Sequence, residues 1–297
     1  MRLRVRFQRL GKVRFTSHRD IARIWERAVR RAELPMAYSQ GFTPRPRLSF
    51  GLALSTGYES LAEYLDIELD ADDTPTAGSS VDESVGRGAG RVVDLATLPA
   101  ALSEALPTGL DVTAVAVIAP GTESLQQAVT SCSWDIVLRD VDAATVDAAI
   151  ARVLAADHIP VTRERKGKPV QDDLRPGVLH LALVRADDGG VLVHAELGAQ
   201  PRALRPSELL GVMDLRDHEG LVRRTHQWMY DGHHHREPLA ADVARRVPVA
   251  GDALRRDDDH VRSPGRPDTP DTDPGADRDA ARRAAGAAPA GLIRAGS

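Results

Sequence analysis

The chain has 297 residues and a formal net charge of −4 at pH 7, and 42% of its residues are hydrophobic. This length is enough for two domains, each with its own core. The single cysteine, Cys132, excludes a disulfide framework and any Cys-ligated zinc or iron–sulfur site built by this chain alone, because each needs several thiolates. No apolar run approaches the roughly 18–20 residues that cross a bilayer, so we expect a cytoplasmic protein without a membrane partner.

Positive charge is concentrated at the N-terminus. Residues 1–50 hold thirteen Lys and Arg against three Asp and Glu, whereas residues 51–150 hold three against seventeen. Charge of one sign that clusters in this way most often marks an interaction surface. Three interpretations stay open: a nucleic acid or another phosphorylated partner, an acidic protein surface, or a solvated face without a role.

Residues 1–33 predict a strand followed by a helix. Alternation from Leu3 to Phe15 predicts a half-buried strand or hairpin that turns at 11–12 and carries arginines on an open face. Ser17 and Asp20 fit a capping box that begins a helix over about 18–33. Its arginines recur at helical spacing and predict a cationic stripe formed by Arg23, Arg27, Arg30 and Arg31. The arginines expected on the open face of the strand are Arg2, Arg4 and Arg6. The aromatic residues expected in the core are Phe7, Phe15 and Trp25.

The elements that follow complete a first expected domain over residues 1–120. Two prolines and two aromatic residues predict an ordered loop over 38–47. Residues 71–94 are small, polar and Gly-rich and predict a mobile insertion. The other expected elements are strands over 48–54 and 61–69, a helix over 97–107 and a strand over 111–119. The order β-α-β-β-α-β predicts a ferredoxin-like domain.

Residues 131–230 repeat this order in part. The expected elements are strands over 133–138, 160–165, 179–184 and 191–196 and helices over 143–156 and 206–213. We therefore expect an α+β fold of two tandem ferredoxin-like domains. Residues 231–297 contain no Phe, Trp or Tyr. Such a tail cannot bury enough apolar surface to offset the ordering entropy of about 1–2 kcal/mol per residue, so we expect it to be disordered.

The strongest candidate for a binding site is the arginine-rich helix together with the loop 38–47. Arginine binds phosphate through two parallel hydrogen bonds, and aromatic rings stack on unpaired bases. Tyr38 and Phe42 either serve this role or anchor the loop in the core. The candidate substrate-binding residues are Arg14, Ser17, His18, Arg19, Arg23, Arg27, Arg30, Tyr38, Gln40, Phe42, Arg45 and Arg47.

Other residues carry weaker signals. His18 suits general acid–base catalysis because imidazole titrates near neutral pH, but it equally fits a surface or capping residue, so the catalytic residues stay unassigned. The basic turn 163–168 either extends a phosphate-binding surface or is a solvated hairpin tip. Three adjacent histidines at 233–235 do not make a defined site, and no metal site is expected. The sequence has no P-loop, Rossmann, zinc-protease or serine-hydrolase signature.

Several motifs also resemble a known family. They are Arg6-Phe7, Gly11-Lys12-Val13-Arg14-Phe15-Thr16-Ser17-His18-Arg19-Asp20 and above all Tyr38-Ser39-Gln40-Gly41-Phe42-Thr43-Pro44-Arg45-Pro46 with Leu48-Ser49-Phe50-Gly51. The chain thereby resembles the stand-alone form of the radical-SAM-associated protein family, whose biochemical function is unknown. In that family the domain stands alone or is joined to the C-terminus of a cobalamin-binding-type radical SAM protein. The chain departs from it in a longer segment 71–94 and in Leu174, where the family tends toward isoleucine.

The resemblance implies a non-catalytic accessory protein. The chain lacks the three-cysteine cluster motif, so the radical SAM partner is expected to carry the iron–sulfur cluster and S-adenosylmethionine, and this chain is expected to bind no cofactor. Its arginine-rich face would present an RNA substrate to that partner. Two alternatives remain: an RNA-processing endonuclease in which His18 acts with Arg19 or Tyr38, and a pure protein adaptor that docks on the partner through residues 1–50.

Overall fold

The computed structural model describes residues 1–70, 93–165, 167–230, 232 and 234–239. No helix in these ranges is long and apolar enough to cross a membrane. The predicted mobile insertion lies outside the described residues except for positions 93 and 94, and so does the predicted disordered tail from residue 240 onward.

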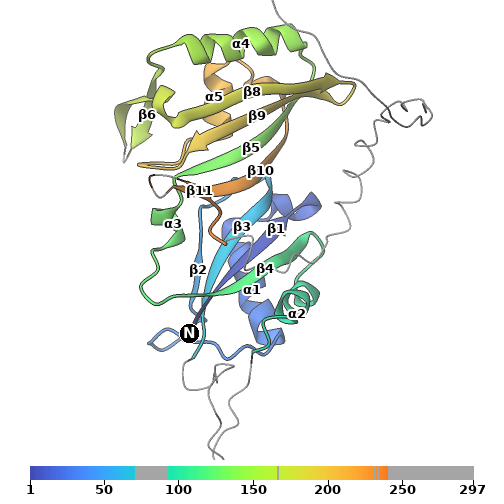
Figure 1. Ribbon diagram of the computed structural model, residues 1–297, viewed down its shortest axis with the longest axis vertical. Coiled ribbons are helices and arrows are strands. Elements are labelled where there is room, and N and C mark those ends of the chain that lie inside the picture. The colour runs from blue at the N-terminus through green and yellow to red at the C-terminus, as the bar shows by residue number, and fades with distance from the viewer. Residues whose placement is uncertain (71–92, 166, 231, 233, 240–297) are drawn as a thin grey trace, which may run out of the picture. The chain divides into compact units, whose positions relative to one another are not determined.

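The first half of the described chain alternates strands and helices in the predicted order (Figure 1). The elements are β1 (Arg2–Arg9), a 3₁₀ helix (Gly11–Phe15), α1 (His18–Arg31), β2 (Leu48–Phe50), β3 (Glu59–Glu68), α2 (Leu98–Ala105) and β4 (Leu110–Ile118). Strand β1 lies between β4 and β3, and β2 pairs with β3. All of these pairs are antiparallel.

The second half again has helices between its strands. The elements are α3 (Leu125–Ala128), β5 (Ser131–Leu138), α4 (Ala143–Ala155), β6 (Pro160–Arg165), β7 (Lys168–Asp173), a 3₁₀ helix (Arg175–Gly177), β8 (Val178–Asp187), β9 (Gly190–Gly198), α5 (Pro206–Val212), a 3₁₀ helix (Arg216–His218), β10 (Glu219–Tyr230) and β11 (His235–Arg236). Four strands form an antiparallel array in the order β10-β5-β9-β8. Strands β6 and β7 form a separate hairpin.

A single sheet runs through both halves in the order β4-β1-β3-β10-β5-β9-β8. The halves meet where β3 and β10 pair in parallel, and this ladder has only two Cα pairs, Arg223 with Glu59 and Arg224 with Ser60. The α+β class is as predicted, but the strands of the two expected domains join in one sheet.

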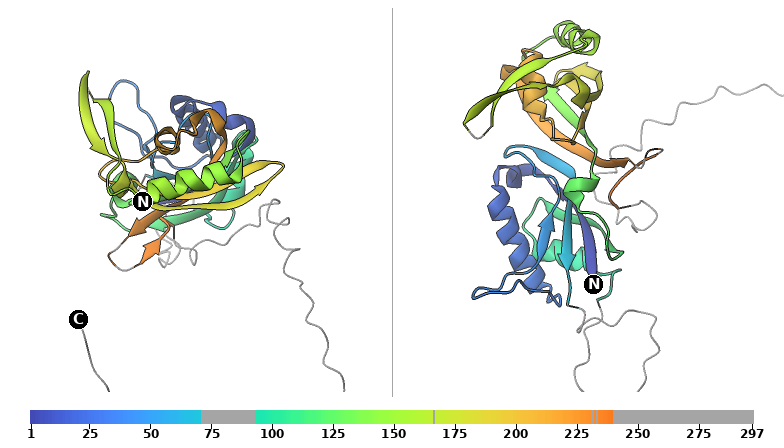
Figure 2. Two further views of the ribbon diagram at one scale, coloured as in Figure 1. Left: turned by 90° about the horizontal axis from the view of Figure 1, so that it is seen from above. Right: turned by 90° about the vertical axis from the view of Figure 1, so that its left-hand side faces the viewer.

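Helices cover one face of the sheet in each half. In the first half Trp25 of α1 packs edge-on against Phe7, with ring centroids 4.9 Å apart, and Leu102 of α2 joins the same core. In the second half Ile150 of α4 and Leu209 of α5 pack into the core formed with β5 and β9. Burying each such side chain stabilises the fold by roughly 1.5–3 kcal/mol. Helix α1 and the β6–β7 hairpin project to the same side of the sheet (Figure 2).

Helix α1 forms as predicted and ends two residues earlier. The hydroxyl oxygen of Ser17 accepts a hydrogen bond from the backbone N–H of Asp20 at 3.2 Å, and the Asp20 carboxylate accepts one from that hydroxyl at 2.7 Å. Its buried residues recur at helical spacing and are Ile21, Trp25, Ala28 and Val29. The predicted arginine stripe therefore faces solvent.

The predicted strand from Leu3 to Phe15 is wrong beyond Arg9. Gly11 adopts a φ of +68°, which ends the strand, and a 3₁₀ helix follows. The guanidinium of Arg9 holds this turn by donating to the carbonyl oxygens of Val13 at 3.1 Å, of Arg14 at 2.8 Å and of Thr16. The core position predicted for Phe15 is also wrong, because its side chain lies on the turn and is 63% exposed.

The arginine-lined face of β1 is not open as predicted. Arg4 is buried and pairs with Asp66 at 2.7 Å. Glu237 pairs with Arg6 at 2.9 Å, and Leu239 is buried against the same face. A segment that the sequence placed in the disordered tail therefore covers this face.

Strand β10, the longest strand of the described chain, was not predicted. Its buried positions include Arg224, Thr225 and Gln227, so the strand lacks the apolar alternation that identifies half-buried strands. Strands β7 and β11 were also not predicted. The strand predicted over 48–54 ends at Phe50, and the Leu52 carbonyl beyond it accepts a hydrogen bond from Arg224 instead of continuing the ladder.

Replacing Gly109 by Ala should destabilise the protein by more than about 1 kcal/mol, measured by urea unfolding. Gly109 has a φ of +93°, and a Cβ there would lie 2.4 Å from the carbonyl oxygen of Leu10. Gly57→Ala is the matched control, because Gly57 has a φ of +92° with nothing within 4 Å. Equal losses in both variants would show that the contact with Leu10 is unimportant.

Candidate functional site

The outer face of α1 carries exposed guanidinium groups with few acidic neighbours. We define the cationic face as Arg19, Arg23, Arg27 and Arg30, all exposed. Arg23 pairs with Asp20 at 3.3 Å, and both side chains are more than half exposed, so this pair adds little stability. Within the described residues no carboxylate pairs with Arg19, Arg27 or Arg30. The cationic face therefore keeps most of its charge available to a partner.

The loop that follows α1 is ordered, as predicted. Tyr38 and Pro46 form an isolated bridge, and the Ser39 N–H donates to the Arg45 carbonyl at 2.9 Å. Phe42 lies at the tip with its ring fully exposed, and Tyr38 is 43% exposed. Both aromatic residues therefore present ring surface to solvent, which excludes a role in the core.

The remaining predicted residues differ in what they contact. Ser17 is used by the helix cap, and Arg14 lies 3.5 Å from Glu59 with its guanidinium over the Phe15 ring. Arg47 pairs with Glu68 at 3.0 Å in solvent. Gln40 and Arg45 are exposed on the loop. Of the predicted set, the structure therefore leaves the α1 arginines, Gln40, Arg45 and the loop aromatics available.

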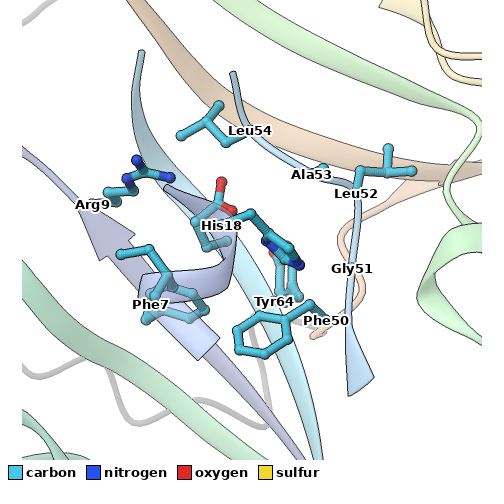
Figure 3. Close-up of a pocket in the computed structure, with 11 residues that line it drawn as sticks. Phe7, Arg9, His18, Phe50, Gly51, Leu52, Ala53, Leu54 and Tyr64 are labelled. Atoms are coloured by element: carbon cyan, nitrogen blue, oxygen red, sulfur yellow. The ribbon is translucent and has the colours of Figure 1, made fainter. Parts of the chain in front are cut away.

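His18 stands at the start of α1, where it lines a small hollow (Figure 3) and also a wider cleft of about 590 Å³ with Arg2, Phe50 and Ser124. Its ring packs edge-on against Phe50 with centroids 5.2 Å apart. The hollow has a volume of about 10 Å³, which is room for about one water molecule. In the part of the chain that the structure describes, no hydrogen bond or ion pair holds the His18 ring, so no observation favours His18 as a general acid or base.

Leu52 and Ala53, which line the hollow, also line a much larger cleft. We call it the junction cleft; its volume is about 510 Å³. Its first-half wall is Leu52, Ala53 and Ser55. Its second-half wall is Cys132, Trp134, Arg163, Glu164, Leu197, Arg202, Ala203, Leu204, Arg205, Pro206, Glu208 and Arg224.

Carboxylates orient two arginines of the junction cleft. Asp172 accepts hydrogen bonds from Arg202 at 2.7 Å and from Arg163 at 2.9 Å. The Arg202 hydrogen bond is the main reason that the pKa of Asp172 lies below its ordinary value, so this carboxylate stays charged at neutral pH. Arg202 also donates to Glu208 at 3.0 Å. These contacts fix both guanidinium groups before any ligand binds.

Arg224 lies at the floor of the junction cleft and is 1% exposed. It pairs with Glu63, donates to the Leu52 carbonyl at 3.0 Å and lies 5.5 Å from the Trp134 ring centroid. Its Nε–H and the indole N–H of Trp134 have no acceptor. An unmade buried hydrogen bond costs about 1–3 kcal/mol, so each donor calls for an explanation.

Cys132 borders the same cleft but offers no reactive thiolate. Burial raises the pKa of its thiol, so the group is protonated at neutral pH. Among the residues with described positions, no group of three or more His, Cys, Asp or Glu is arranged to hold a metal ion. The polar groups of the cleft wall are arginines and the carboxylates of Glu164 and Glu208, and the rest of the wall is largely apolar.

Glu59 of β3, like Glu63, pairs with an arginine of β10 and so connects the two halves. Glu59 accepts hydrogen bonds from Arg223 at 2.7 Å and from the Gly11 N–H at 2.8 Å. Burial by itself would raise the pKa of Glu59, but these hydrogen bonds outweigh it and the pKa lies below the ordinary value. Glu59 thus joins β10 to the turn that precedes α1.

Sequence reasoning did not find the junction cleft. The only sequence feature that pointed toward this cleft was the basic turn 163–168, because Arg163 lies on the cleft wall. Arg224 and Trp134 are separated by 90 positions and meet only because β10 pairs with β5.

The chain matches a family model over residues 2–206, described as "Uncharacterized protein conserved in bacteria (DUF2344)". The match spans more than half of the chain, which therefore belongs to this family. The matched region contains the cationic face, the loop and most of the junction cleft. A search of the curated proteins gives no match.

Two solved structures show a low similarity. One, "Crystal Structure of a Cbf5-Nop10-Gar1 Complex", aligns with 76% of this chain and 48% of its own at 11% identity and a TM-score of 0.39. The other, "Crystal structure of the archaeal box H/ACA sRNP Nop10-Cbf5 complex", aligns with 76% and 47% at 9% identity and a TM-score of 0.37. The chain thus spans about half the length of these chains, and a likeness at this level carries no inference about function.

Glu63→Gln should destabilise the protein by about 3–5 kcal/mol in urea unfolding, because it leaves the buried charge of Arg224 without a counter-charge. Glu68→Gln is the control, since its pair with Arg47 is exposed and should contribute at most about 1 kcal/mol. A loss below about 1 kcal/mol for Glu63→Gln would contradict the importance assigned to this pair.

Proposed function

We propose that this protein is a cytoplasmic, non-catalytic accessory protein that binds RNA through the cationic face and the loop 38–47 and presents it to a radical SAM partner enzyme. The observation that carries the proposal is that Arg19, Arg27 and Arg30 are exposed and have no carboxylate partner within the described residues. Such arginines bind phosphate without first giving up an ion pair of their own.

The spacing of the arginines suits a phosphate chain. Arg23 and Arg27 are four residues apart on α1, which is about 6 Å along the helix axis. Each guanidinium can bind a phosphate through two parallel hydrogen bonds, and each such contact releases a counterion from the nucleic acid. Binding through this face is therefore expected to be strong at low salt and weak at high salt.

The loop aromatics favour unpaired RNA over a duplex. Phe42 and Tyr38 expose ring surface on an ordered loop, and the bases of a single strand stack on such rings. The bases of a regular duplex are already stacked on each other. We therefore infer a single-stranded or looped segment as the bound form.

The family resemblance supports the partner and its cofactors. A radical SAM enzyme needs three thiolates for its cluster, and this chain offers only Cys132, so the iron–sulfur cluster and S-adenosylmethionine are assigned to the partner. The repeated strand orders, β4-β1-β3 with β2 and β10-β5-β9-β8, also support our interpretation of the fold as two ferredoxin-like units in tandem.

Replacing both Arg27 and Arg30 by Glu should weaken binding of a single-stranded RNA oligonucleotide by at least about tenfold at about 0.1 M salt, measured by fluorescence anisotropy. The slope of log affinity against log salt should fall by about 2, one for each lost phosphate contact. The matched control is Arg152→Glu with Arg185→Glu, which makes the same charge change on exposed arginines of the second half.

Equal binding by the two double variants would contradict the assignment of the cationic face. Failure of the unaltered protein to bind RNA, with or without the partner enzyme, would contradict RNA binding itself. If the Arg27→Glu, Arg30→Glu variant then also failed to co-purify with the partner enzyme, the protein-adaptor alternative would replace the proposal.

A further inference from the structure

The last described residues of the chain, 235–239, contact both halves, and we call them the strap (Figure 1). Three alternate side chains of the strap, those of His235, Glu237 and Leu239, contact the rest of the protein. Their respective partners are Glu196 of β9 at 3.7 Å, Arg6 of β1 at 2.9 Å, and the cluster of Ala62, Tyr64, Ala114, Ala116 and Leu125. We call the surface formed by these partners the strap face. Contacts at every second position are typical of a bound extended peptide, because its side chains alternate between two sides.

The strap face suits a different kind of side chain at each position. The Arg6 guanidinium and the Tyr64 hydroxyl both reach the same carboxylate oxygen of Glu237, at 2.9 and 3.3 Å. Burial raises the pKa of Tyr64, so its hydroxyl is protonated at neutral pH and donates. Leu239 is 5% exposed among the apolar side chains, and the carboxylate of Glu196 suits a hydrogen-bond donor. The strap face therefore fits a donor, an acidic residue and an aliphatic residue at alternate positions.

The strap does not use every donor that the face offers. The Nε–H of Arg6 is buried without an acceptor, although Glu237 lies against the neighbouring Nη2. Asp66 makes the fuller contact with Arg4, since it accepts from both Nε and Nη2, at 2.7 and 2.9 Å. A carboxylate in the position of Glu237 therefore reaches the unused Nε–H of Arg6 by a small rotation. A segment placed in this way would bind the face better than the strap does.

Few contacts hold the strap, and several of them are long. Strand β11 shares only two Cα pairs with β10. The Arg4 guanidinium lies 3.5 Å from the Pro238 carbonyl oxygen, and the Tyr64 hydroxyl lies 3.3 Å from Glu237, both beyond the ordinary range for a hydrogen bond. Short edge elements with few contacts open more readily than the core of a sheet. We therefore expect the strap to detach while the rest of the fold stays intact.

We propose that the strap face is a docking site for an extended segment of a partner protein, in which an acidic residue is followed two positions later by an aliphatic residue. The strap occupies this site as an autoinhibitory mimic. A peptide fits better than RNA, because a phosphate chain has no group for the apolar cluster and would meet the carboxylate of Glu196. The identity of the partner as the radical SAM enzyme rests on the proposed function. Tethering gives the strap an effective concentration of about millimolar order, so the partner must be held by other contacts as well.

The test uses the full chain and a fluorescein-labelled peptide with the sequence of residues 234–239, measured by anisotropy. Leu239→Lys places a charge in the buried position and should release the strap. The peptide should bind this variant at least about tenfold more tightly than the unaltered chain, in which the strap competes. Arg6→Gln in the released chain, or Glu237→Lys in the peptide, should abolish this binding. Leu154→Lys is the matched control, because it makes the same change at an exposed position of α4 and should leave peptide binding unchanged.

Two results would overturn the docking site. One is peptide binding that does not depend on Arg6. The other is the absence of peptide binding to a released chain that is folded. The second release variant, Glu237→Gln, removes the charge that pairs with Arg6 and keeps the test valid if Leu239→Lys does not fold.

The purified radical SAM partner separates this inference from the proposed function. Arg6→Gln should weaken co-purification of the partner and Leu239→Lys should strengthen it, while RNA binding by the cationic face stays unchanged. Unchanged co-purification would overturn the docking role and leave RNA binding standing. A released chain that gains affinity for RNA and not for the partner would assign the strap face to RNA instead. Peptide and partner binding by a chain that binds no RNA would contradict only the proposed RNA binding.

Discussion

Two arginine–carboxylate contacts, one buried and one half-exposed, hold the halves of this protein together. The parallel ladder between β3 and β10 has only two Cα pairs, so side-chain contacts stabilise this junction. Arg223 of β10 pairs with Glu59 of β3, and Arg224 pairs with Glu63. Glu59 also accepts from the N–H of Gly11, and so the same contact fixes the turn from which α1 starts. The direction of the cationic face and the shape of the junction cleft both depend on this pairing. Because a fully buried charge such as that of Arg224 is stable only when it is paired, the junction is sensitive to the loss of Glu63.

The arginines of the N-terminal fifty residues have two different roles that composition does not separate. Arg4 and Arg9 are buried and stabilise the fold. Arg4 pairs with Asp66, and Arg9 donates to three backbone carbonyl oxygens. Those on the outer face of α1 have no comparable partners and keep their charge for an external ligand. The proposed function depends on the second group alone. The first group instead holds β1 to β3 and fixes the turn that precedes α1.

The parts of the molecule that follow from local sequence were predictable. The cap at Ser17 and the amphipathic pattern of α1 each depend on neighbours within a few residues, and the ordered loop is indicated by its own prolines and aromatic residues. The parts that depend on contacts between residues far apart in the sequence were not predictable. Glu237 covers a face of β1 that the alternation of residues predicted to be open. Strand β10 shows no apolar periodicity, because Arg224 and Gln227 occupy its buried positions. The junction cleft, with walls from both halves, could not be assembled from the sequence without this strand pairing.

The proposed role of α1 is to bind RNA in the cell. Its most direct test is crosslinking of RNA to the protein in living cells followed by sequencing, with the unaltered chain compared with one in which Arg23, Arg27 and Arg30 are replaced by Glu. We expect a defined set of RNA fragments to be recovered with the unaltered chain and lost with the variant, while both chains accumulate to the same level. Recovery of the same fragments at the same yield from both chains would contradict this role.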